Sequence, residues 1–149
     1  MRLYRISSEK YAQSLGASGR ANRWNVSKQY VIYASSSRSL AALELLAHRN
    51  AIMEGLKYKM VVIEFPGQKG TVEIMDEKKL LPNWHLLQYR ANTQTLGGVW
   101  YEQKSSVALK VPSAIIPYEF NFVSNTQHPG FSQVKIERLE DFNWDQRLL

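Results

Sequence analysis

The 149-residue chain contains no cysteine, which excludes disulfide bonds, thiolate nucleophiles and cysteine-based zinc sites. Its three histidines, His48, His85 and His128, lie far apart in the sequence, and none has the short spacing of a zinc site. The G-x-S-x-G segment of a serine hydrolase is also missing, so a serine-hydrolase triad has little support. We therefore expect no metal site and no thiol chemistry.

Long apolar runs are missing as well. The longest ones, at 40–47 and 60–63, are too short or too interrupted to span a membrane. The N-terminal residues 1–5 read Met-Arg-Leu-Tyr-Arg and are not followed by the apolar core of a signal peptide. Together with the lack of cysteine, these absences predict a cytoplasmic protein without a membrane partner.

The chain carries a net charge of +6, but its basic residues are dispersed. No Arg-rich helix, zinc-finger spacing or aromatic-and-basic strand typical of a nucleic-acid-binding domain is present. A moderate positive excess also suits an anionic small molecule or an acidic protein partner. We therefore expect no direct binding of nucleic acid.

Length and patterning predict one α+β domain over residues 1–149. Ser35-Ser36-Ser37 supplies N-cap candidates for a helix through about His48. The helix is apolar nearly all round, so we expect it to be buried on most faces. No repeat or linker divides the chain, and residues 80–84 read as an irregular or short helical segment. Alternating and β-branched residues predict strands at 2–6, 30–34, 57–65, 71–75, 107–111, 120–123 and 134–139.

Three segments far apart in the chain each present a polar residue in an apolar or constrained setting. Arg23 lies in Arg-Trp-Asn, Glu44 in Leu-Ala-Ala-Leu-Glu, and Ser113 follows Val-Pro shortly before Asn121. A guanidinium can pair with phosphate in a bidentate fork, and a carboxylate can stabilise positive charge that develops on a ribose carbon. The set therefore indicates a site for an anionic, sugar-bearing ligand.

Each of these residues also has a purely structural interpretation. Glu44 falls within the apolar surface of its helix, so it either meets a donor such as Arg5 or Arg23 or occupies a narrow exposed strip. Arg23 can stack on an indole in a simple loop, and Ser113 can turn the backbone. Tyr33 can be a core aromatic or a stacking platform. The residues alone leave these alternatives open.

Taken together and in order, several short motifs resemble the RES domain family, which is named for an Arg, a Glu and a Ser. The resemblance covers essentially the whole chain, including its ending at 142–147. Two departures are visible, Ala21-Asn22 where the family usually has Gly-Gly, and Thr126 where it commonly has proline. The motifs are Leu-Tyr-Arg-Ile at 3–6, Arg-Trp-Asn at 23–25, Val-Ile-Tyr at 31–33, Ser-Leu-Ala-Ala-Leu-Glu at 39–44, Leu-Pro-Asn-Trp at 81–84, Leu-Gly-Gly-Val-Trp at 96–100, Val-Pro-Ser-Ala at 111–114 and Asn-Thr-Gln-His-Pro at 125–129.

This resemblance implies an ADP-ribosyltransferase-like split β-core flanked by helices, in an enzyme that breaks the nicotinamide–ribose bond of NAD⁺. NAD⁺ would be the substrate, and no resident cofactor is implied. Carried onto this chain, the resemblance implies catalytic roles for Glu44, Ser113 and Tyr33, and binding of the dinucleotide by Arg5, Arg23 and Tyr33. Asn121, in the segment after Ser113, is a further candidate for binding the dinucleotide. The acceptor of ADP-ribose could be water, phosphate or a protein.

The resemblance also implies a partner. The family comprises toxins of type II toxin–antitoxin pairs of the Xre/RES type, in which an antitoxin with a DNA-binding domain blocks the active site with its C-terminal segment. A homodimer within such a complex is consistent with this arrangement. The alternatives are a mono-ADP-ribosyltransferase that modifies a cellular protein, and a non-catalytic interaction domain of the same fold. The presence of Arg23, Glu44 and Ser113 together favours an enzyme.

Overall fold

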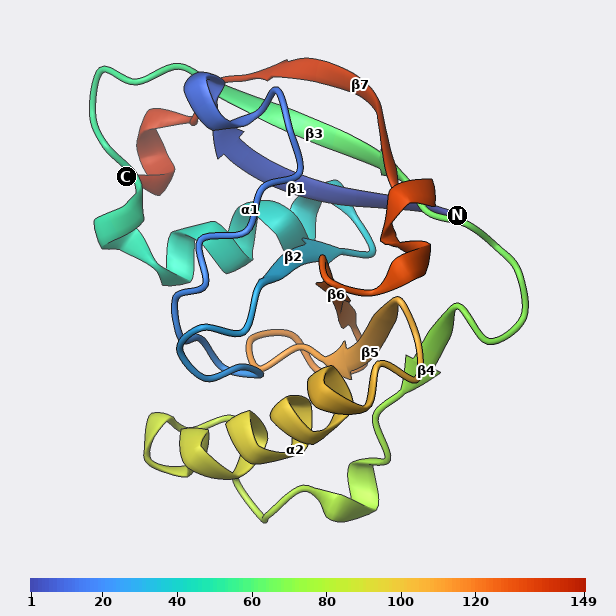
Figure 1. Ribbon diagram of the computed structural model, residues 1–149. Helices are drawn as coiled ribbons and strands as arrows, with labels where there is room; N and C mark the ends of the chain where they lie inside the picture. The colour runs from blue at the N-terminus through green and yellow to red at the C-terminus, as the bar shows by residue number, and fades with distance from the viewer.

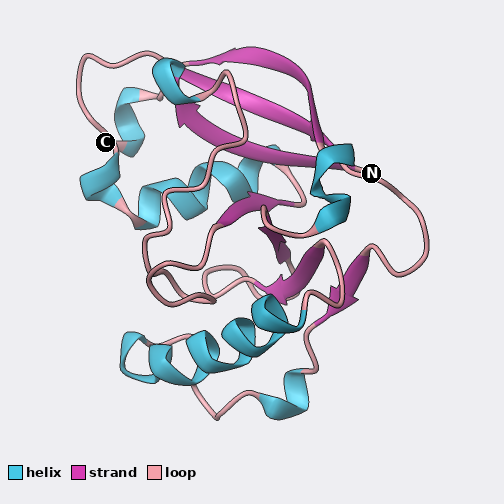
Figure 2. Cartoon of the chain, viewed as in Figure 1, coloured by secondary structure: helices cyan, strands magenta, loops and turns pink.

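A computed structural model describes residues 1–149, apart from the side chain of Arg49. The fold is α+β, as predicted, with seven strands, two α-helices and several short 3-10 helices (Figures 1 and 2). Among the described helices, none is both long and apolar enough to cross a membrane. The strands are β1 (Arg2–Ser8), β2 (Val31–Ser35), β3 (Tyr58–Glu64), β4 (Val72–Ile74), β5 (Ala108–Pro112), β6 (Phe120–Asn125) and β7 (Lys135–Phe142), and the α-helices are α1 (Arg38–Ala47) and α2 (Arg90–Gln103). The 3-10 helices are Glu9–Tyr11, Arg49–Ala51, Glu77–Lys79, Leu87–Tyr89, Pro129–Gln133 and Gln146–Leu148.

The seven strands form one sheet in the order β4-β5-β6-β2-β1-β3-β7. Neighbouring strands are antiparallel except β4 and β5, which are parallel. β1 pairs with β3 along its whole length but meets β2 at the single pair Tyr4–Ser35. The sheet is therefore nearly divided between β1 and β2, which gives the split β-core that the resemblance implies (Figure 1).

Each half of the sheet is covered by its own helix. α1 packs Ala41 against Ile6 and Met60 of the β1–β3 half. α2 packs Trp100 against Leu109 of the β4–β5–β6 half. A third apolar cluster, which includes Leu3, Val61, Ile63, Phe65 and Phe122, involves both halves of the sheet. The sequence-predicted residues Glu44, Ser113 and Asn121 lie on or next to α1, β5 and β6, so they come from both helix-covered halves.

The first helix begins where the sequence predicts, but it is less buried. Ser37 is its N-cap and accepts a hydrogen bond from the backbone N–H of Leu40. Only Leu40 and Ala41 are fully buried within α1, whereas Leu43 is 38% exposed. The prediction of burial on most faces is therefore wrong. α1 covers the edge of a half-sheet with one face, and its other apolar residues are small or partly exposed.

The second helix was not predicted. α2 contains Gly97-Gly98 at its centre and few apolar residues in its first half, a composition that disfavours an isolated helix. Its stability must come from packing, because Thr93, Gly97, Trp100 and Tyr101 are buried against the rest of the chain. At Gly97 an added Cβ would lie 1.9 Å from the carbonyl oxygen of Trp24, so only glycine permits this close approach.

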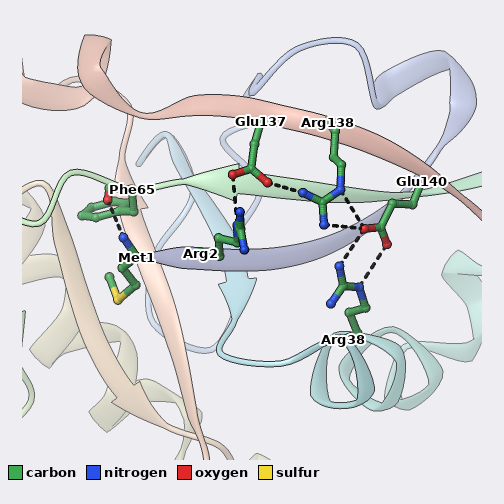
Figure 3. A network of polar contacts seen from close by, with 7 residues as sticks. All are labelled: Met1, Arg2, Arg38, Phe65, Glu137, Arg138 and Glu140. Carbon is green, nitrogen blue, oxygen red and sulfur yellow. Dashed lines mark hydrogen bonds and ion pairs between the residues drawn. The ribbon is translucent and has the colours of Figure 1, made fainter.

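A surface network of charges connects β1, β7 and the start of α1 (Figure 3). The Glu140 carboxylate accepts two hydrogen bonds from Arg38, at 2.6 and 3.0 Å, and a further one from Arg138 at 3.1 Å. Arg138 also contacts Glu137, which in turn accepts from Nε of Arg2 at 3.0 Å. Since Arg38 is the first residue of α1, the network fixes the helix that carries Glu44 onto the β1–β3–β7 half of the sheet.

Candidate active site

Three predicted site residues from three different elements meet at one carboxylate oxygen. Glu44 on α1 accepts through Oε1 a hydrogen bond from Oγ of Ser113 at 2.9 Å and one from Nδ2 of Asn121 at 2.5 Å. Ser113 follows the last residue of β5, and Asn121 is the second residue of β6. Oε2 of Glu44 has no hydrogen-bond donor among the residues that the structure describes. One carboxylate oxygen is therefore held by the protein, and the other is available to a ligand.

The two donors are themselves held in place. Oγ of Ser35 donates to Oδ1 of Asn121 at 2.6 Å, so the amide turns its Nδ2 toward Glu44. The Ser113 hydroxyl accepts from the backbone N–H groups of Ile115 and Ile116, at 3.1 Å each, while its own proton points to Glu44. Ser113 therefore both turns the backbone and belongs to the site. Ser35, which the sequence offered only as a helix cap, is a supporting residue that the prediction missed.

Among the residues that the structure describes, no cation contacts Glu44 directly. Of the two interpretations that the sequence left open, the structure supports the one in which a donor meets Glu44, but the donors are a hydroxyl and an amide and not Arg5 or Arg23. Arg23 nevertheless lies close enough to interact with it electrostatically. Burial lowers the pKa of Arg23, and the negative charge of Glu44 opposes that shift.

Arg5 is not brought to this group. Tyr4 pairs with Ser35, so Tyr4, Ser35 and Asn121 share one face of the sheet, and the alternation along β1 directs Arg5 to the opposite face. Burial alone lowers the pKa of Arg5, with no contribution from a charged neighbour. The predicted alternation of β1 is confirmed, but it separates Arg5 from the other candidate residues.

The loop that carries Arg23 is fixed by its neighbour Asn25 and by Tyr33. The buried Asn25 amide donates to the backbone carbonyls of Arg20, Val26 and Gln29, and its oxygen accepts from the Tyr33 hydroxyl at 2.6 Å. The same hydroxyl accepts from the backbone N–H of Trp24 at 3.1 Å. Burial raises the pKa of Tyr33, so its phenol stays neutral. The hydroxyl of Tyr33 therefore positions the loop, and its single proton is donated to Asn25.

The first turn of α2 supports this loop from the other side. Oγ1 of Thr93 donates to the carbonyl of Arg23 at 2.6 Å, and Nε2 of Gln94 donates to that of Asn22 at 2.9 Å. Asn22 belongs to the Ala21-Asn22 pair that stands where the family usually has Gly-Gly. Its Oδ1 accepts a hydrogen bond from the backbone N–H of Arg23 at 2.8 Å. The loop is therefore ordered here by side-chain hydrogen bonds.

The Arg23 side chain stacks on an indole, as one interpretation of the sequence suggested. The indole belongs to Trp84, which is distant in sequence, and not to the adjacent Trp24. Nη1 of Arg23 donates to the Trp84 carbonyl at 3.4 Å, and Cζ lies 5.9 Å from the centre of the Trp84 ring. Trp84 in turn packs against the buried Trp24 with ring centres 5.7 Å apart. The structural interpretation of Arg23 is therefore supported, and its guanidinium still has N–H donors without a hydrogen-bond partner among the described residues.

Two hollows in the surface lie elsewhere. One of about 350 Å³ is lined by residues such as Lys59 and Asp141, and one of about 210 Å³ lies between β4 and α2 and includes Ile74 and Trp100. Neither is lined by Glu44 or by the residues that contact it. The arrangement of charges and donors around Glu44, and not the size of a cavity, therefore identifies the candidate site.

Comparison with known proteins agrees with the motifs and the fold. The RES domain family matches residues 2–145. A protein named Toxin Res from Photorhabdus laumondii is 32% identical and aligns with 100% of this chain and 97% of its own length. A protein named Prs ADP-ribosylating toxin from Sphingobium sp. is 30% identical, over 90% of this chain and 84% of its own. The crystal structure of the M. tuberculosis MbcT–MbcA toxin–antitoxin complex contains a similar fold, with a TM-score of 0.75, 16% identity and coverage of 95% of this chain and 84% of the other.

Proposed function

Because the chain belongs to the RES domain family, we propose that it is the toxin of a type II toxin–antitoxin pair and that it cleaves NAD⁺ between nicotinamide and ribose. The observation that carries the proposal is the state of Glu44. Its carboxylate is fixed through one oxygen by two neutral donors, while the other oxygen and the nearby Arg23 have no partner of opposite charge among the described residues. Such a site can stabilise a cationic carbon and an anionic phosphate at the same time.

The chemistry requires little more than this arrangement. When the bond between the ribose carbon and nicotinamide breaks, both electrons go to the ring nitrogen, which loses its positive charge. Nicotinamide leaves as a neutral molecule, so no general acid is needed. Positive charge develops on the ribose, as in glycoside hydrolysis, and the free oxygen of Glu44 would stabilise it. Ser113 and Asn121 would hold the carboxylate in position.

Binding of the dinucleotide would position the scissile bond. In this proposal the Arg23 guanidinium pairs with the diphosphate, and the ring of Tyr33 contributes a flat surface near the nicotinamide. Binding energy from the remote parts of NAD⁺ then orients the reacting carbon toward Glu44. The support is geometric, since Arg23 and Tyr33 are linked through Asn25 and Trp24 on the same loop. Arg5, on the other face of the sheet, has no part in this arrangement.

Transfer of ADP-ribose to a cellular protein is the second candidate. It is favoured by the Sphingobium relative, whose name states that it is an ADP-ribosylating toxin. The same cleavage step serves hydrolysis, phosphorolysis and protein modification, because the acceptor attacks only after the nicotinamide bond has weakened. The choice among water, phosphate and a protein therefore depends on what reaches the ribose carbon.

We further propose a cognate antitoxin as the partner, with a DNA-binding domain and a C-terminal segment that blocks the site. The solved complex of the M. tuberculosis toxin with its antitoxin supports an antitoxin partner. The net charge of +6 favours an acidic blocking segment. The toxin would act in the cytoplasm, where NAD⁺ is available, and would bind neither nucleic acid nor membrane directly. A homodimer within the complex fits this proposal.

The deciding experiment incubates the purified protein with NAD⁺, with and without inorganic phosphate, and identifies the products by mass spectrometry. We expect nicotinamide together with ADP-ribose, or with phosphorylated ADP-ribose when phosphate is present. Labelling of a protein in a cell extract, with most of the NAD⁺ left intact, would instead favour the transferase. A folded protein that neither consumes NAD⁺ nor labels a protein would overturn the enzymatic proposal in favour of a non-catalytic interaction domain.

A further inference from the structure

Arg90, the first residue of α2, was not among the predicted site residues, yet its charge lies beside the site. Its Nη2 donates to the backbone carbonyl of Ala21 at 3.1 Å. Its Nε is buried and has no hydrogen-bond partner among the described residues. No carboxylate within the described part of the chain forms an ion pair with it. The guanidinium is therefore anchored at one end, while a buried donor remains unused.

Arg90 and Arg23 are neighbours through a shared anchor. Oγ1 of Thr93 contacts the carbonyl oxygen of Arg23 at 2.6 Å and that of Arg90 at 3.0 Å. After burial and the opposing effect of Glu44, the positive charge of Arg90 is a further cause of the lowered pKa of Arg23. The positive charge of Arg90 also lowers the pKa of Tyr33, although burial has the larger, opposite effect. The two positive charges therefore lie close enough to repel each other, at a cost in free energy, and neither forms an ion pair with a carboxylate among the described residues.

We propose that Arg90 and Arg23 together form a two-guanidinium site for phosphate oxygens, with Arg90 as a phosphate-binding residue of the enzyme. The inference rests on the proposed function and extends it to a residue that the family pattern did not indicate. A phosphate group between the two guanidinium planes would relieve their repulsion and accept the unused Nε–H of Arg90. The phosphate oxygens belong either to the diphosphate of NAD⁺ or to free inorganic phosphate that acts as the acceptor.

The kinetic test compares Arg90→Gln with Lys69→Gln. The control removes one positive charge from an exposed turn between β3 and β4, so both variants have the same net charge. If the site holds the diphosphate, Arg90→Gln raises KM for NAD⁺ about ten- to hundred-fold in phosphate-free buffer and changes kcat much less. If it holds the acceptor, KM for NAD⁺ is unchanged, and half-maximal formation of phosphorylated ADP-ribose needs about ten- to hundred-fold more phosphate. If Arg90→Gln matches Lys69→Gln both in KM for NAD⁺ and in the phosphate requirement, the inference is overturned.

A binding test separates this inference from the proposed function. Inorganic pyrophosphate should raise the melting temperature of the parent protein, because a ligand that binds only the folded state stabilises it. Arg90→Gln should lose most of that rise, and Lys69→Gln should keep it. This measurement does not require turnover. If the parent protein fails to cleave NAD⁺, the proposed function falls, whereas the pyrophosphate shift still decides the role of Arg90.

Arg90→Lys distinguishes ligand binding from simple support of the loop. Lysine keeps the positive charge and one donor for the Ala21 carbonyl but cannot present a second donor in a fixed plane. We expect an intermediate loss of pyrophosphate stabilisation. If Arg90 only supports the loop, both substitutions would lower the melting temperature without ligand and leave the pyrophosphate-induced rise unchanged, which would refute the proposal. Should Arg90→Gln fail to fold, the same comparison between Arg90→Lys and the parent decides.

Discussion

Two carboxylates lie along helix α1 and have different kinds of hydrogen-bond partners. Glu140 of β7 contacts the first residue of the helix, and Glu44 belongs to the helix itself. Glu140 on β7 is surrounded by the guanidinium groups of Arg38 and Arg138 (Figure 3). Glu44 is bound by the neutral side chains of Ser113 and Asn121. Arginine thus neutralises a carboxylate in the surface network, whereas no arginine among the described side chains forms an ion pair with Glu44.

The difference separates a structural use of charge from a functional one. In the surface network each charge already has its partner, so nothing remains for a ligand. Around Glu44 the negative charge of the carboxylate and the positive charges of Arg23 and Arg90 are close but not paired through hydrogen bonds. Charges held apart in a partly buried place cost stability, and proteins retain them where a ligand or a reaction uses them.

The largest effect is expected from removing the charge of Glu44. Glu44→Gln keeps the shape and an oxygen that can accept from Ser113 and Asn121, so the fold should remain intact. The cationic ribose loses its stabilising charge, and we expect NAD⁺ consumption to fall about 100- to 1,000-fold, which is about 2.7–4 kcal/mol of transition-state stabilisation. Product formation followed by chromatography measures this, and the melting temperature checks the fold.

The matched control for this variant is Glu140→Gln, which removes the same charge from the surface network. Its activity should stay within about two-fold of the parent, because no part of the network contacts the proposed ligand. Equal losses of activity in both variants would mean that net charge or helix position matters, and not the site carboxylate. Activity near that of the parent in Glu44→Gln would remove Glu44 from the catalytic role.

The second comparison sets Gly97 against Gly98, two adjacent glycines of α2. A Cβ at Gly97 would lie 1.9 Å from the backbone oxygen of Trp24, so Gly97→Ala must push the helix away from the Arg23 loop. We expect a loss of about 1–3 kcal/mol in the free energy of unfolding, as for overpacking elsewhere. Gly98→Ala meets only the side-chain amide of Gln29, at 3.2 Å, and should cost much less, since no backbone atom must move and alanine favours the helix.

Chemical denaturation of the two glycine variants measures this difference, and NAD⁺ turnover shows whether the seam between α2 and the loop matters for the site. Gly97→Ala should also weaken NAD⁺ binding, because Arg23 and Arg90 lie on the two sides of that seam. Equal stability of the two variants would show that the close approach at Trp24 is not needed.

The fold was predictable from the sequence where local chemistry determines it. The predicted ranges of all seven strands overlap the observed strands, and several of these, such as β2 and β3, are rich in β-branched or aromatic residues. Ser37 caps α1 as expected. α2 was missed because its stability depends on partners distant in sequence: Gly97 lowers the intrinsic helix propensity, and only contact with Trp24 explains why glycine is required there.

The site was predictable only in part, for a similar reason. Residue type and context pointed to Glu44, Ser113 and Asn121 as site residues. They did not predict that the Ser113 hydroxyl and the Asn121 amide would be the hydrogen-bond donors to Glu44. That arrangement depends on the register of β2 against β6, which aligns Ser35 with Asn121. Arg90 has no motif of its own, and its importance follows from its position beside Arg23, which no local pattern contains.

A smaller effect is expected at Tyr33. Tyr33→Phe keeps the ring but removes the hydroxyl that joins the Trp24 N–H to Asn25. The two buried groups lose a partner, and we expect the protein to lose about 1–2 kcal/mol of stability. If the hydroxyl only positions the loop, kcat should fall by no more than about ten-fold. A loss as large as that of Glu44→Gln would instead give the hydroxyl a direct role in the reaction.

The smallest effect concerns the pH dependence of the surface network. The hydrogen bonds from Arg38 are the main cause of a lowered pKa at Glu140. A carboxyl with a lower pKa in the folded state adds stability above the unfolded value of about 4.3, and that contribution disappears as the pH falls through the folded value. Because Arg38 and Glu140 are both partly exposed to solvent, the contribution should be below about 1 kcal/mol. The melting temperatures of the parent and Glu140→Gln should therefore differ slightly at pH 7 and converge by about pH 3.

High salt at pH 7 should also reduce the difference, since it screens exposed charges. A gap that persists at pH 3 and in high salt would mean that Glu140 stabilises α1 through packing, and the contrast with Glu44 would no longer be one between paired and unpaired charge.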